Sequence, residues 1–140
     1  MFDNDDPRQR ESLVQALHSA GLDAWEFNSG GGIMHVIVTL LDGTVNPPVI
    51  SAQSSKLRAA LENALKTWPH DSTLYIATNS LQSECDIGLM GNDGRTDAQV
   101  TAPDWKHVDS LEEAIPVFQE FWSKRDNWLT AFIAGQLTAA

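Results

Sequence analysis

The first twenty residues carry the pattern of an amphipathic helix. Apolar residues recur three and four positions apart, at Leu13, Val14, Leu17 and Ala20. Asp5 or Asp6 is placed to cap the start of this helix, with Pro7 at its first position. Gly21 is suited to end it, because glycine adopts the positive φ that is common just beyond a helix. The pattern therefore predicts a helix between Pro7 and Gly21.

The next segment changes to the two-residue period of strands. Residues 23–27 alternate between polar and apolar side chains, and residues 33–41 are apolar and β-branched. Between them, Ser29–Gly32 contains three glycines, which can turn the chain without steric cost. We expect a β-hairpin here. The two prolines at residues 46–48 lack backbone donors, so an edge strand or a loop should follow.

A second helix is predicted from Ser54 or Ser55, where helical spacing returns, and Pro69 should stop it. Two strands are expected after it, at Leu74–Thr78 and Cys85–Met90. A turn at Asn92–Gly94 should then lead into a weaker strand at Ala98–Thr101.

Two further helices are predicted in the last third of the chain. Ser110 and Glu113 have the spacing of a capping box. Pro116 lies too deep for the first turn, so it should kink this helix or delay its start. A final helical stripe covers residues 127–137. The order of elements predicts a single α+β domain over residues 1–140. Its mostly antiparallel sheet of four to five strands is packed by an N-terminal helix, a middle helix and one or two C-terminal helices.

Composition and charge narrow the class of protein. The 140 residues carry 19 acids and 9 bases, a net charge of −10, and residues 81–120 hold nine of the acids against two bases. Such a chain repels phosphate backbones and anionic membranes, so we expect neither direct nucleic-acid binding nor membrane binding. The apolar runs are too short to span a bilayer, and the first residues are acidic, unlike a signal peptide. We expect a soluble, cytoplasmic protein.

Several short segments resemble small proteins of actinobacteria and of their phages and plasmids. The segments are Ala20–Trp25, the glycine-rich hairpin before Ile33–Val36, Ile76–Asn79, Cys85–Leu89 and Ser110–Ala114. The helix from Ser54 to Trp68 is additional to that pattern. The family has no established chemistry, so the resemblance implies only an accessory protein of a mobile element.

The residues that often carry chemistry do not form a recognisable motif. Cys85 stands beside Glu84 and Asp86, whose charges raise the pKa of a thiol, so we expect a core cysteine and not a nucleophile. The four histidines lack the spacing of helical zinc ligands. His35 alternates with Met34 and is expected to face solvent from its strand. No catalytic residue, cofactor or metal is expected.

The glycines at residues 30–32 precede a strand and not a helix, which favours a hairpin turn over a phosphate-binding loop. Residues 92–97 include two aspartates and a glycine, but the required oxygen ligands of a calcium loop do not fall at the right positions.

The acidic window at residues 81–120 is either a solubilising surface or a recognition surface. On the second interpretation, the protein is a non-enzymatic interaction module, such as an inhibitor, antidefence or immunity factor, that docks on a basic partner surface. The candidate partner-binding residues are Asp86, Asp93, Asp97, Asp104 and Trp105.

The alternative function is a small-molecule-binding protein or enzyme with a pocket between the sheet and the helices. His35 and Cys85 would then be the candidate site residues. A homodimer through the aromatic C-terminal helix is compatible with either function.

Overall fold

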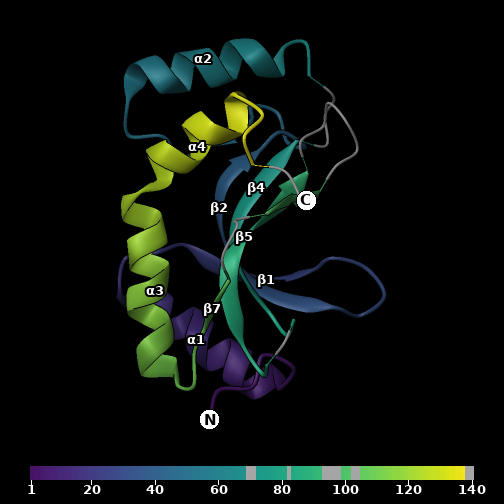
Figure 1. The fold of residues 1–140 in the computed structure, drawn as a ribbon, viewed down its shortest axis with the longest axis vertical. Helices are drawn as coiled ribbons and strands as arrows, with labels where there is room; N and C mark the ends of the chain where they lie inside the picture. The colour runs from purple at the N-terminus through teal and green to yellow at the C-terminus, as the bar shows by residue number, and fades with distance from the viewer. Residues whose placement is uncertain (69–71, 82, 93–98, 102–104, 138–140) are drawn as a thin grey trace. The chain divides into compact units, whose positions relative to one another are not determined.

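The computed structural model describes residues 1–140 except 69–71, 82, 93–98, 102–104 and 138–140 (Figure 1). The elements in these residues are α1 (Pro7–Ser19), β1 (Ala24–Asn28), β2 (Met34–Asp42), β3 (Val49–Ile50), α2 (Ser55–Leu65), β4 (Thr73–Asn79), β5 (Asp86–Asn92), β6 (Gln99–Thr101), β7 (Lys106–His107), α3 (Leu111–Ser123) and α4 (Arg125–Ile133).

The strands of the described residues form a sheet in the order β1-β2-β4-β5-β6, with β3 beside β2 and β7 beside β5. The pairing is antiparallel, as where Phe27 lies opposite His35 and Asp86 lies opposite His107. The predicted α+β class with a mostly antiparallel sheet is therefore confirmed, while the organisation as one domain stays a prediction. Strand β3 follows the two prolines and, among the described strands, pairs only with β2, so it is the edge strand expected there as the alternative to a loop. Strand β7 has two residues, too few for a period-two pattern to reveal it.

Close contacts divide the chain into two compact units. Unit 1 is Met1–Val38, Ile76–Gly88 and Asp104–Trp122, and unit 2 is Thr39–Tyr75, Leu89–Pro103 and Ser123–Ala140. The core of unit 1 includes the buried side chains of Leu13, Leu17, Val36, Ile37, Ile76, Ile87 and Phe118. The core of unit 2 includes those of Leu40, Leu41, Leu61, Leu74, Leu89, Leu129 and Phe132.

The local predictions for the first helix and the hairpin are confirmed. The side chain of Asp6 caps α1 by accepting a hydrogen bond from the Arg8 N–H at 2.9 Å, and Pro7 is the first helical residue. Gly21 follows the helix with φ 86°. The turn between β1 and β2 has positive φ at each residue of Gly30–Gly32, so it needs glycine there. These signals act over a few residues, which is why the sequence alone reveals them.

Pro116 does not delay the start of α3, so that alternative was wrong. The helix begins at Leu111 and continues through Pro116. Pro116 is exposed, which leaves water able to bond the carbonyl of Glu112 that loses its helical partner. The Ser110 hydroxyl accepts from the Glu113 N–H at 3.2 Å, as the predicted capping box requires. The carboxylate of Glu113, however, accepts from the N–H of Asp109 at 2.9 Å.

In unit 2, α2 packs against α4 (Figure 1). Ser54 caps α2 as expected, accepting from the Leu57 N–H at 3.2 Å. The rings of Trp68 and Phe132 lie 5.8 Å apart, so part of the apolar stripe of α4 is used within the unit. Strand β6 lies where the weaker strand was predicted. The turn predicted at Asn92–Gly94 falls partly outside the described residues.

A carboxylate on α4 holds the start of α2. The two oxygens of Asp126 accept hydrogen bonds from the N–H groups of Gln53 at 2.7 Å and Ser54 at 2.9 Å. We expect Asp126→Ala to lower the free energy of unfolding by about 1–2 kcal/mol, the usual cost of losing a helix cap. Asp126→Asn, which keeps one oxygen acceptor, should cost less. Urea denaturation measures both, and Asp23→Ala, at an exposed acid, is the charge-matched control. Equal losses for Asp126→Ala and Asp23→Ala would contradict the assignment.

Candidate functional site

Two of the five predicted partner-binding residues lie in the described part of the chain. Asp86, at the start of β5, is only 6% exposed, and the Ser83 hydroxyl donates to its carboxylate at 2.9 Å. Trp105 is half-buried, with its ring so close to Gly88 that an added Cβ there would lie 2.6 Å from it. Both side chains are thus engaged within unit 1. The other three, Asp93, Asp97 and Asp104, lie outside the described residues.

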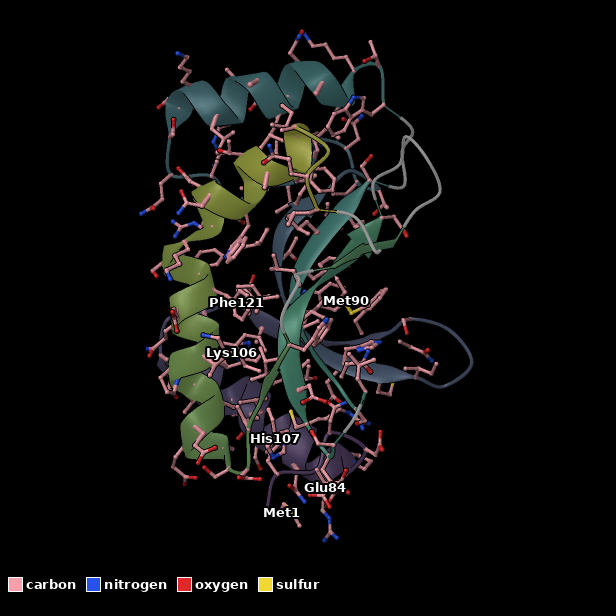
Figure 2. All side chains as sticks on the ribbon, viewed as in Figure 1. Met1, Glu84, Met90, Lys106, His107 and Phe121 are labelled. Atoms are coloured by element: carbon pink, nitrogen blue, oxygen red, sulfur yellow. The ribbon has the colours of Figure 1, made fainter. Side chains whose placement is uncertain are left out.

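The fold of unit 1 joins the N-terminal segment to the acidic window. The N–H of Phe2 donates to the carbonyl of Asp109 at 2.7 Å, and that of Asn4 donates to the carbonyl of Glu84 at 3.0 Å. Figure 2 shows Met1, Glu84 and His107 at this end of the unit. We call the gathered carboxylates the acidic end; they are Asp3, Asp5, Asp6, Glu84, Asp109, Glu112 and Glu113.

A histidine borders the acidic end. His107 Nε2 lies 2.7 Å from the Asp109 carboxylate, and its Nδ1 lies 2.7 Å from the Ser83 hydroxyl. Because that hydroxyl already donates its proton to Asp86, it must accept from His107, so both ring nitrogens face acceptors. The hydrogen bond to Asp109 is the main cause that raises the pKa of His107. The imidazolium form is therefore favoured at this position.

A second histidine corrects the sequence-based interpretation. His35 was expected to face solvent, but its side chain is 1% exposed. Strand β2 is central in the sheet and most of its residues are buried on either face, so alternation does not separate core from solvent there. Its Nδ1 lies 2.7 Å from the carbonyl of Thr78 and its Nε2 lies 2.7 Å from the hydroxyl of Ser29. Burial lowers the pKa of His35.

Buried polar groups continue from this histidine towards the N-terminus. The Thr78 hydroxyl accepts from the Val36 N–H at 2.8 Å and donates to the side-chain oxygen of Asn4. The side-chain amide of Asn4 in turn donates to the Met34 carbonyl at 3.1 Å. Sequence reasoning missed Asn4, Ser29 and Thr78. No spacing signal could have found them, since Asn4 and Thr78 stand 74 positions apart.

Cys85 has the properties expected of a core residue. It is fully buried, and burial, reinforced by the charges of Asp86 and Asp3, raises its pKa to about 12. The thiol therefore stays protonated at neutral pH and is a poor nucleophile.

Across the described residues, no three His, Cys, Asp or Glu side chains are arranged to hold a metal ion. Among the helices of the described residues, none has the length and apolar character that a membrane span requires.

No protein-family model matches the chain, and no curated protein or solved structure matches it either.

The contributions of His35 and His107 to the stability of the fold should change with pH in opposite directions. The lowered pKa of His35 means that its contribution is present above the unfolded value of about 6.5 and is lost as pH falls below it. The raised pKa of His107 means that its contribution is present below about 6.5 and is lost as pH rises through the folded value.

We expect His35→Gln to remove part of the loss of stability on the acid side, and His107→Gln to remove part of the decline on the alkaline side. Urea denaturation of the wild type and of each variant, from mildly acidic to mildly alkaline pH, measures this. A His35→Gln profile parallel to that of the wild type would show that His35 does not titrate as its burial requires.

Proposed function

We propose that this protein is a protein-interaction module that presents an acidic surface, on unit 1, to a partner with a basic surface. The observation that carries the proposal is the separation of charge between the two units. Thirteen of the 19 acids but only three of the nine bases belong to unit 1, a net charge of −10. The six acids and six bases of unit 2 cancel. The excess charge of the chain therefore belongs to unit 1, and such an excess attracts oppositely charged partners.

The acidic end is the part of unit 1 best suited to meet the partner. Five of its carboxylates are on exposed residues, namely Asp5, Glu84, Asp109, Glu112 and Glu113. They come from three separate segments, so the local negative potential is produced by the fold and exceeds that of any one segment. Charged surfaces of this kind accelerate encounter with an oppositely charged protein and reject partners of like charge.

Local structure accounts for some of these acids but not for all of them. Glu112 and Glu113 lie in the first turn of α3, where the helix dipole favours negative charge. Asp6 caps α1. The Asp5 carboxylate, in contrast, has among the described residues only the Ser80 hydroxyl as a hydrogen-bond partner, at 3.4 Å, and that hydroxyl lies closer, at 3.2 Å, to the Glu84 carbonyl. Glu84 is exposed in the loop before β5. These two side chains are the most direct candidates for contact with a partner.

A surface pocket adjoins the acidic end. Its volume is about 290 Å³, and Met1, Phe2 and Leu111 give it an apolar lining beside Glu112. An arginine or lysine side chain has a methylene stem and a cationic head, which suit such a lining and such a carboxylate. The pocket therefore supports a basic protein as the partner. A protein surface rich in arginine and lysine, such as one that binds nucleic acid, would fit this description. An inhibitor, antidefence or immunity factor acts in this way.

Charge reversal within and outside the acidic end tests this proposal. We expect the double variant Asp5→Lys/Glu84→Lys to weaken binding of a fluorescent polyarginine peptide by at least about tenfold, or about 1.4 kcal/mol. The control, Asp23→Lys/Glu62→Lys, changes the net charge equally at exposed acids elsewhere and should alter binding by less than about twofold. Fluorescence anisotropy at low and high salt measures both, and the difference should shrink at high salt.

Equal weakening by the two double variants would show that binding follows net charge alone. Thermal unfolding of each variant confirms that the fold is retained.

A further inference from the structure

Ser29 and His35 meet where the β1–β2 hairpin turns. The Ser29 hydroxyl lies 2.7 Å from His35 Nε2, and the opposite ring nitrogen lies 2.7 Å from the carbonyl oxygen of Thr78. Ser29 is exposed, whereas His35 is 1% exposed. An accessible hydroxyl is thus held against a buried imidazole, in a loop that projects beyond the helices of unit 1 (Figure 1).

The hydrogen-bond partners settle which nitrogen carries the proton. The carbonyl of Thr78 can only accept, so Nδ1 of His35 must be the donor there. Nε2 is then the unprotonated nitrogen, and it accepts the hydroxyl proton of Ser29. Burial lowers the pKa of His35, which keeps this basic form at neutral pH. A nucleophile, a base and a group that orients the base are therefore in contact, with a main-chain carbonyl in the orienting position.

The glycines after Ser29 supply hydrogen-bond donors. Within the described chain, the N–H groups of Gly31 and Gly32 have no hydrogen-bond partner. Both residues have positive φ, and a Cβ added at either would meet nothing within 4 Å. Successive main-chain N–H groups in such turns bind anions. The turn thus keeps two main-chain N–H donors, two and three residues after Ser29, that no other described group uses.

Apolar side chains lie beside the pair. The ring of Phe27 lies 6.4 Å from that of His35, and the ring of Trp25 meets Phe27 edge-on at 5.8 Å. Trp25 is 42% exposed, and Ile33, just beyond the glycines, is 57% exposed. A substrate with an apolar acyl group can lie against these side chains while its carbonyl approaches Ser29.

We infer that Ser29 is a nucleophile activated by His35 as general base, and that together they hydrolyse esters of small apolar acyl groups. Ser29 Oγ forms a bond to the acyl carbon, its proton passes to Nε2, and the carbonyl electron pair moves to oxygen. When the carbonyl re-forms, the bond to the leaving alcohol breaks and the alcohol takes the proton from Nε2. Water then attacks the acyl-serine in the same way, which releases the carboxylic acid and restores Ser29.

The full chain can be tested with a fluorophosphonate probe and with p-nitrophenyl butyrate. We expect the probe to form one adduct, located at Ser29 by mass spectrometry, and the ester to be hydrolysed faster than in buffer alone. Ser29→Ala should abolish both results, and His35→Gln should lower hydrolysis by about 100-fold or more. Ser12→Ala, at an exposed serine on α1 whose hydroxyl donates to the Arg8 carbonyl, is the matched control and should change neither.

A cysteine at position 29 gives a second test, which needs no ester substrate. This test also does not depend on whether the His35→Gln variant folds. We expect Ser29→Cys to react with iodoacetamide at neutral pH at least about tenfold faster than Ser12→Cys, because an adjacent imidazole lowers the pKa of a thiol. Cys85 should not react in either variant, since its pKa is raised to about 12.

Equal alkylation rates for the two cysteine variants, or a wild type without an adduct at Ser29, would overturn the inference. Neither result bears on binding at the acidic end, so the two proposals stand or fall separately.

Discussion

Thr78 joins the parts of unit 1 on which both proposals depend. Its hydroxyl accepts from the N–H of Val36 and donates to Asn4, while its carbonyl oxygen accepts from the ring of His35. Asn4, His35 and Thr78 are each at most 1% exposed. Polar groups so deeply buried destabilise a fold unless each has its partner, so this set favours the observed arrangement of the N-terminal segment, β2 and β4.

That arrangement has consequences at two surfaces. With Asn4 held inside, the neighbouring acids Asp3 and Asp5 are kept close to Glu84 and Asp109, and the acidic end is assembled. With the ring of His35 oriented by the Thr78 carbonyl, the remaining nitrogen is directed to Ser29. A buried network of uncharged groups thereby holds the acids of one surface close together and places the His35 ring beside Ser29 at another. Either feature would be lost if the strands paired in another register.

The charge of unit 1 works against its compactness. Ten net negative charges in one unit repel one another, and this repulsion lowers stability. Arg10 offsets part of it from within: its side chain is 8% exposed, forms an ion pair with Glu26 at 2.7 Å and donates to the Asn4 carbonyl at 2.8 Å. His107 offsets another part at the acidic end.

Several local features of the fold can be predicted from this sequence. The caps at Asp6 and Ser54, the proline that opens α1 and the glycines of the hairpin are recognisable because each acts on its own few residues. The unreactive character of Cys85 was expected from its acidic neighbours, but its raised pKa comes mainly from burial, which the fold provides. The periodicity of apolar residues was sufficient for the α+β class and for most of the strands.

Tertiary structure alone decided what those elements do together. The burial of His35 depends on β2 having a neighbour on each side, which its own alternation does not encode. The contact between Asn4 and Thr78 and the assembly of the acidic end depend on segments that are far apart in the chain. The local elements and the total charge could thus be predicted from the sequence. Strand order decides which polar groups are buried together and which surface carries the charge. The sequence does not reveal that order, because the pairing of two distant segments produces no periodic pattern in either segment.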